Sequence, residues 1–216
     1  MTNQEVFDEL KANLSKVKPL KAVSSLNELN KIIIDLELSS DVKDSIGFAK
    51  NDASLDTFFC DYEPKAILKK GKYLDVLNQA LTSFKATNKN PYKKLVQAVL
   101  LSSRYLAAFD SFDDYLKKLK EATKTDSDEI NFLENFRKNS GIFGMCFIKA
   151  CSVFQLSGLL DIPVTSTKTK QYLAKSISLE DNNTQAFTAL KEIAKDNNIS
   201  CYTLNSLIDA KKYERI

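Results

Sequence analysis

The stretch that decides the fold reads NSGIFGMCFIKAC (residues 139–151) and continues as GLLDIPVTSTKTK (residues 158–170). A short turn that contains Gly141 and Gly144 precedes a compact apolar segment, which predicts a helix from Gly144 to Leu156. The second string is rich in Thr and contains a Pro, as expected of a loop that opens another helix. The stretch therefore predicts a helical hairpin with a glycine turn, followed by a loop and a third helix.

Helix signals recur on both sides of this stretch. Gly158 stands where a helix stops, and Thr165 or Ser166 is placed to cap the next one. Residues 51–64 are less regular, with residues 58–60 expected as a short buried link. The other helices are expected at about residues 2–15, 25–36, 40–48, 72–86, 91–109, 111–120, 127–138, 165–176, 184–195 and 200–211.

Residues that break helices are sparse, since the 216 residues include only 5 Gly and 4 Pro. Long apolar-periodic segments with few breakers predict an all-α protein. The chain is long enough for one large domain or two small ones, and no linker interrupts it. We expect residues 1–216 to form a single helical domain or two packed halves, residues 1–90 and 91–216.

The chain contains no His, which removes His-based triads and His metal ligands. Its four Cys show no Cys-x-x-Cys spacing, and Cys146 and Cys151 are expected as buried free thiols in an apolar helix. We therefore expect neither a metal nor a cofactor. No apolar run approaches the length of a membrane span and no apolar leader opens the chain, so a cytoplasmic protein without a membrane partner is expected.

Residues 92–173 resemble the helix-hairpin-helix base-excision DNA glycosylase superfamily. A long helix from Tyr92, an acidic-capped helix after Asp110 and the glycine turn follow one another as in a branch of that family. Nothing before residue 90 carries the resemblance. It implies an all-α fold of the helix-hairpin-helix glycosylase kind, in which the hairpin grips one DNA backbone and the later loop carries a catalytic Asp.

The glycine turn is the part of the resemblance that implies DNA binding. The family pattern of Gly, hydrophobic residue and Gly lets backbone N–H groups and a helix N-terminus face a phosphate. Here the positions read Gly144, Met145 and Cys146, so the second Gly is lost. A Cys side chain is expected to restrict positive φ and to crowd a phosphate. A hairpin kept only for packing fits the same residues.

The catalytic positions of the family are not matched. The Lys that attacks the sugar in bifunctional members corresponds to Ile148, and the neighbouring Lys149 falls on another helix face. The Asp corresponds to Ser166, or to Thr165 after a shift of one residue, and a hydroxyl cannot supply its negative charge. Asp161 is the nearest acid. The catalytic residues stay unassigned, with Asp161, Ser166 and Lys149 as candidates.

The resemblance and the lysines of the loop together predict double-stranded DNA as the partner, bound through backbone phosphates. Lys makes point contacts to phosphate, whereas Arg, which reads base edges in forked pairs, occurs only three times. Sequence-specific reading is therefore not expected. The DNA-binding candidates are Gly141, Gly144, Lys149, Lys168, Lys170 and Lys175.

A second pattern competes with this one near the C-terminus. Residues 192–208 resemble a helix-turn-helix with a turn at Asn198, although two packed terminal helices need the same pattern. In the DNA-reading arrangement four side chains would face the major groove: Cys201, Tyr202, Thr203 and Asn205.

Three functions therefore remain open. The leading expectation is a DNA-binding protein without glycosylase activity. The first alternative is an active DNA glycosylase that flips a damaged base and uses a relocated acid such as Asp161. The second is a helical protein-interaction module that has kept only the fold.

Overall fold

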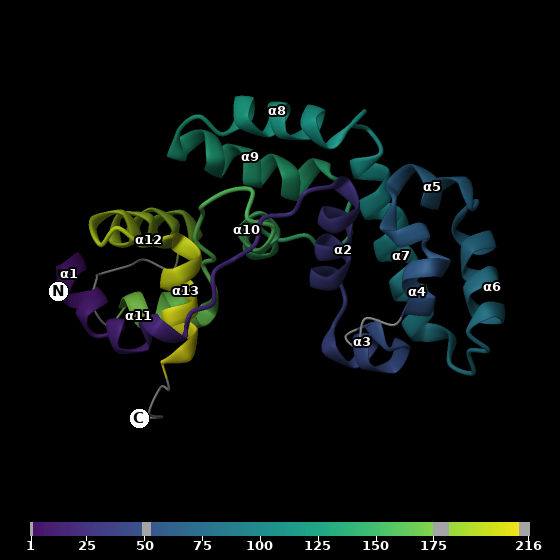
Figure 1. Cartoon of the computed structure of the whole chain (residues 1–216), viewed down its shortest axis with the longest axis horizontal. Helices are drawn as coiled ribbons and strands as arrows, with labels where there is room; N and C mark the ends of the chain where they lie inside the picture. The colour runs from purple at the N-terminus through teal and green to yellow at the C-terminus, as the bar shows by residue number, and fades with distance from the viewer. Residues whose placement is uncertain (1, 49–52, 175–181, 212–216) are drawn as a thin grey trace. The chain divides into compact units, whose positions relative to one another are not determined.

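Helices are the regular secondary structure of the chain, and no strand occurs among residues 2–48, 53–174 and 182–211, which the computed structural model describes. This confirms the predicted all-α class. The chain divides into two compact units, Met1–Ala22 with Cys146–Ile216 (unit 1) and Val23–Met145 (unit 2). The helices of both units are labelled in Figure 1.

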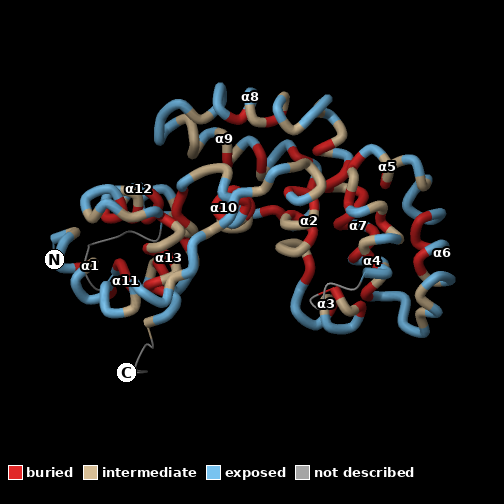
Figure 2. Tube along the Cα trace, viewed as in Figure 1, coloured by how far each residue is buried: buried red, intermediate tan, exposed pale blue. Residues whose placement is uncertain are grey.

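Unit 2 is built around its longest helix. Lys89–Leu106 (α7) packs against four others, and residues such as Leu95, Val96 and Val99 are fully buried on the packed side. Figure 1 shows these helices together, and Figure 2 shows the buried positions of α7 facing them. The other helices of unit 2 are Leu26–Glu37 (α2), Ser40–Ile46 (α3), Ala53–Phe58 (α4), Cys60–Tyr62 (η3), Pro64–Lys69 (α5), Tyr73–Ser83 (α6), Phe112–Ala122 (α8) and Asp126–Asn139 (α9).

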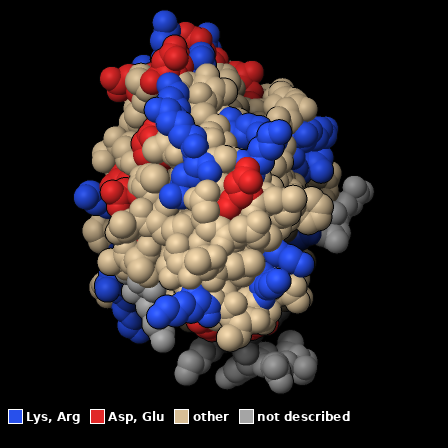
Figure 3. Space-filling model, turned by 90° about the vertical axis from the view of Figure 1, so that its right-hand side faces the viewer, with Lys and Arg blue, Asp and Glu red and all other residues tan. Residues whose placement is uncertain are grey.

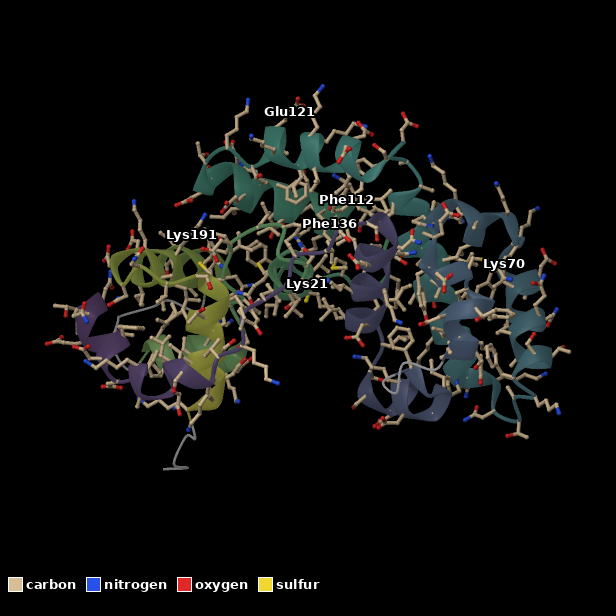
Figure 4. All side chains as sticks on the ribbon, viewed as in Figure 1. Lys21, Lys70, Phe112, Glu121, Phe136 and Lys191 are labelled. Atoms are coloured by element: carbon tan, nitrogen blue, oxygen red, sulfur yellow. The ribbon has the colours of Figure 1, made fainter. Side chains whose placement is uncertain are left out.

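Aromatic side chains join α7 to the helix that leads into the glycine turn. The rings of Tyr105 in α7 and Phe136 in α9 meet edge to face, with centroids 5.1 Å apart. Phe136 also stacks on Phe132, and it is labelled in Figure 4 with Phe112 of α8. Such pairs stabilise a core beyond the area they bury. This contact packs α9 against α7 within unit 2.

Unit 1 combines the N-terminal residues with the C-terminal helices. Val6 and Leu10 lie in one apolar cluster with Tyr172, Leu190 and Leu204, and the Tyr172 hydroxyl donates to Val6 O at 3.0 Å. The helices of unit 1 are Asn3–Asp8 (α1), Lys11–Lys16 (η1), Phe147–Leu156 (α10), Thr167–Ala174 (α11), Asn183–Asp196 (α12) and Cys201–Ala210 (α13).

This division of the chain differs from the one at residue 90 that the sequence suggested. The N-terminal 22 residues belong with α10 to α13, because their apolar side chains complete the cluster around Leu190 and Leu204. Contacts between residues so far apart leave no local signal in the sequence. The two units each have their own buried core.

Several expected helix limits were wrong. The first α-helix ends at Asp8 and is followed by a 3-10 helix, and α10 begins at Phe147 rather than Gly144. The region expected to be irregular contains the helix α4, and α5 was not predicted although Pro64 occupies its first turn, where Pro is favoured. Cys151 is buried as expected, whereas Cys146 is exposed.

Among the described residues, no helix combines the length and the hydropathy that crossing a membrane requires.

Candidate nucleic-acid interface

The turn between α9 and α10 exposes its backbone. Gly141 and Gly144 are exposed and have φ of 72° and 82°, in the region that favours glycine. A Cβ added at Gly141 would meet no atom within 4 Å. Ile142 and Met145 are buried and anchor the turn, whereas Phe143 between them is 75% exposed. The turn therefore leaves room for another molecule to approach Gly141.

The first turn of α10 begins without a side-chain cap. Its N-cap residue, Cys146, is exposed and accepts no hydrogen bond through its side chain. The first N–H groups of a helix have no partner inside the helix, and they carry partial positive charge. The N-terminus of α10 is thus a site where an anion would be stabilised.

Cys146 does not strain the backbone. Its φ of −107° and ψ of 170° are those of an extended residue, which any amino acid adopts. The loss of the second glycine of the family pattern therefore has no backbone consequence at this position. The chain passes from unit 2 to unit 1 at this residue.

Two buried amides hold the loop that follows α10. Asn205 accepts from Val164 N–H through Oδ1 and donates to Val164 O through Nδ2, each at 2.9 Å. Gln155 Nε2 donates to Ile162 O at 2.7 Å and to Asn205 Oδ1 at 2.9 Å. Because Val164 N–H can only donate, it fixes the orientation of the Asn205 amide and, through it, that of Gln155. The backbone of residues 162–164 is therefore tied to α10 and α13.

The two catalytic candidates in this loop line different cavities. Asp161 accepts from Cys201 N–H at 2.8 Å and lines a cavity of about 360 Å³. Ser166 lines another, of about 470 Å³, together with Lys168 and Asp209. Ser166 Oγ accepts from Thr169 N–H at 3.2 Å, which makes it the cap of α11. Both side chains thus have structural bonds at helix N-termini.

The lysine candidates belong to two elements of unit 1. Lys149 is half-buried in the first turn of α10, and Lys168 and Lys170 are in the first turn of α11, where Lys168 is exposed. Lys168 Nζ lies 3.9 Å from the Asp209 carboxylate, a long distance for an ion pair. Lys175 lies outside the described residues. Among the described residues, Lys149 is not on the lining of either cavity.

The helix-turn-helix alternative loses two of its four reading residues. Cys201 is buried and Asn205 is 7% exposed, with its amide bonded to Val164. Neither side chain can reach a base edge while these contacts hold. The expected turn is present, with Asn198 at φ of 53°, so the pattern describes two packed helices.

Gln155 and Asn205 were not predicted as the residues that shape this loop. Their partners lie 7 to 50 residues away, and an isolated Gln or Asn in a helix gives no sign of them. A second feature was visible in the sequence but was missed, namely a lysine-rich segment between residues 65 and 94. Counting charge in windows along the chain would have found it.

Comparison of the chain with protein-family models, with curated proteins and with solved structures found no match.

Proposed function

We propose that this protein binds double-stranded DNA through its backbone phosphates, without reading base sequence and without glycosylase chemistry. The observation that carries the proposal is the uncapped N-terminus of α10, which begins three residues after Gly144 in the chain. Backbone N–H groups at such a terminus can face a phosphate oxygen with no side chain between them. The resemblance to helix-hairpin-helix DNA glycosylases supports the same reading of this turn.

The start of α11 supplies a second group of phosphate contacts. Lys168 and Lys170 lie within one helical turn that also holds Thr167 and the capping Ser166. Lysines and hydroxyls are common partners of phosphate oxygens, and each neutralised phosphate releases counterions. Gln155 and Asn205 hold the loop that precedes this turn. The backbone at Lys168 and Lys170 therefore loses little conformational freedom when DNA binds.

The absence of glycosylase chemistry rests on three residues. Ile148 stands where bifunctional relatives of the proposed family carry the attacking Lys, and Ser166 stands where the Asp is expected. The Ser166 hydroxyl caps α11, and the Asp161 carboxylate holds the N-terminus of α13. Asp161 and Ser166 line different cavities. The Asp161 carboxylate therefore supplies no negative charge in the cavity that Ser166 lines.

Reversing the charge of the α11 lysines tests the phosphate contacts. We expect Lys168→Glu with Lys170→Glu to weaken duplex binding by about tenfold or more at low salt, because two phosphate contacts become repulsive. The loss should be equal for unrelated duplex sequences, and the slope of log affinity against log salt should become shallower. Fluorescence anisotropy with two labelled duplexes measures both quantities.

A matched control separates contact from net charge. Lys18→Glu with Lys195→Glu makes the same charge change at two exposed positions of unit 1. We expect it to weaken binding by less than about threefold, since neither position belongs to α11 and only the general attraction of the protein for DNA is reduced. Equal losses in the two double variants would mean that Lys168 and Lys170 make no specific contact.

Covalent trapping tests the predicted lack of strand-nicking chemistry. With Ile148 at the position of the attacking amine, borohydride should trap no adduct on a duplex that contains an abasic site or a damaged base. Denaturing gels detect an adduct as a shifted band. A shifted band that Lys149→Met abolishes would instead identify Lys149 as a nucleophile and support an active glycosylase.

A further inference from the structure

The charges of unit 2 are strongly segregated along the chain. Residues 64–94 contain eight Lys and a single acid, Asp75, whereas residues 23–63 contain three Lys and nine Asp or Glu. The formal net charge of the whole protein is only +3. The basic segment therefore stands out against a nearly neutral chain, and its charge is local to one part of unit 2.

The fold gathers this segment into one group of helices. It comprises α5, α6 and the first two turns of α7, and both α5 and α6 pack on α7. The Tyr73 hydroxyl of α6 donates to Lys93 O of α7 at 3.5 Å. Figure 3, which faces this end of unit 2, shows Lys and Arg side chains spread around a largely uncharged surface, with Asp and Glu mainly at the upper and left edges of the view. The residues of this lysine face are Lys65, Lys69, Lys70, Lys72, Lys85, Lys89, Lys93 and Lys94.

These lysines have no carboxylate partners. No ion pair among the described residues involves any of the eight, and seven of them are exposed. Two lysines of α2 and α3 are paired by contrast, Lys31 with Asp56 and Lys43 with Asp35, each at 2.8 Å. Asp75 instead accepts from the backbone N–H of Lys72. Unpaired like charges on one surface repel one another, and a bound polyanion offsets this repulsion.

Apolar and aromatic groups are interleaved with the lysines. At the start of α6, Tyr73 is 36% exposed and Leu74 is 66% exposed. The half-buried rings of Phe84 and Tyr92 stack with centroids 5.7 Å apart. Lys70, labelled in Figure 4, holds its ammonium 4.5 Å from the centre of the Phe58 ring. The lysine face thus offers flat apolar surface as well as positive charge.

We propose that the lysine face binds single-stranded nucleic acid, with the lysines along the phosphates and a base stacked on Tyr73. Proteins that bind single strands combine a positive surface with aromatic rings on which bases stack. A duplex hides the faces of its bases, so Tyr73 and Leu74 would have no partner on it. A protein partner fits less well, because Lys is depleted in protein interfaces and the face contains no Arg. The proposal concerns a surface other than α10 and α11 and does not depend on their binding a duplex.

Charge reversal on the lysine face tests the phosphate contacts. The triple variant Lys69→Glu, Lys93→Glu and Lys94→Glu is compared with Lys117→Glu, Lys120→Glu and Lys124→Glu, which changes the same charge at exposed positions of the same unit. The probe is a labelled 20-nucleotide oligothymidine, measured by anisotropy at low salt. We expect the first variant to lose at least about thirtyfold in affinity and the second less than about threefold.

Tyr73→Ala tests the stacked base. We expect about a tenfold loss on oligothymidine, within the range that one base–aromatic stack supplies, and no loss on an abasic oligonucleotide of equal length. Circular dichroism and thermal unfolding confirm that each variant is folded. The α11 double variant should bind oligothymidine normally, so failure of the duplex proposal leaves this test intact.

Four outcomes would overturn the proposal. They are equal losses in the two triple variants, no binding of oligothymidine by the wild-type protein at low salt, equal effects of Tyr73→Ala on both oligonucleotides, and a larger effect of the Lys69, Lys93 and Lys94 changes on binding to a duplex, polyglutamate or phosphatidylserine vesicles than on binding to oligothymidine. The last outcome would assign the lysine face to another class of polyanion.

Discussion

Replacing Gly158 with Ala is expected to destabilise unit 1 by about 3–5 kcal/mol. Gly158 follows α10 with φ of 66°, a conformation that costs an L-residue about 1–2 kcal/mol. A Cβ at this position would also lie 2.8 Å from the Ala22 Cα. That atom is backbone, so relief of the clash requires residues 19–22 to move. Urea unfolding followed by circular dichroism at 222 nm measures the loss.

Gly141→Ala is the matched control for this prediction. Gly141 has nearly the same φ, 72°, but no atom lies within 4 Å of an added Cβ. Gly141→Ala should therefore lose only the stability that the left-handed backbone conformation costs an L-residue, about 1–2 kcal/mol. If the two variants lose equal stability, the close approach of Ala22 to Gly158 is not a feature of the protein in solution.

Replacing Asn205 with Ala is expected to cost about 3–5 kcal/mol of stability in unit 1. The change removes both hydrogen bonds to Val164 and one to Gln155. It leaves the N–H and C=O of Val164 without these partners, and an unpaired polar group away from water costs about 1–3 kcal/mol. Urea unfolding measures the loss, and it should be accompanied by increased amide exchange in residues 161–166.

Gln185→Ala provides the comparison for Asn205→Ala. Gln185 is an exposed residue of α12, and its loss should change stability by less than about 0.5 kcal/mol. The result for Asn205 also bears on the helix-turn-helix alternative. If Asn205→Ala left stability unchanged but altered the preference for DNA sequence, Asn205 would face DNA and our account of the loop would be wrong.

Helix ends that depend on neighbouring residues were predictable from the sequence. Thr2 and Glu5 form the expected capping box, and Ser25 and Ser111 cap α2 and α8 through bonds to residues three positions on. Gly158 ends α10 as expected. Each of these features is decided within one helical turn, so the signal and its cause lie in the same short window.

Features that depend on distant residues were not predictable. The bonds from Asn205 to Val164 span 41 residues, and the clustering of Val6 with Tyr172 spans 166. The same is true of the candidate interface. The sequence suggested Asp161 and Ser166 as alternatives for one role, whereas in the fold they line different cavities. Periodicity and capping signals contain no information about such pairings.

The central claim, that α10 receives a DNA phosphate at its N-terminus, is tested most directly by nuclear magnetic resonance. Backbone amide signals of Phe147, Ile148 and Lys149 are followed while an unlabelled duplex is added at low salt. We predict that these three amide signals shift more than those of the other residues of α10. Two unrelated duplexes should shift them equally, and added salt should reverse the change. The claim is contradicted if the duplex binds while these amides stay unchanged, or if no binding occurs at low salt.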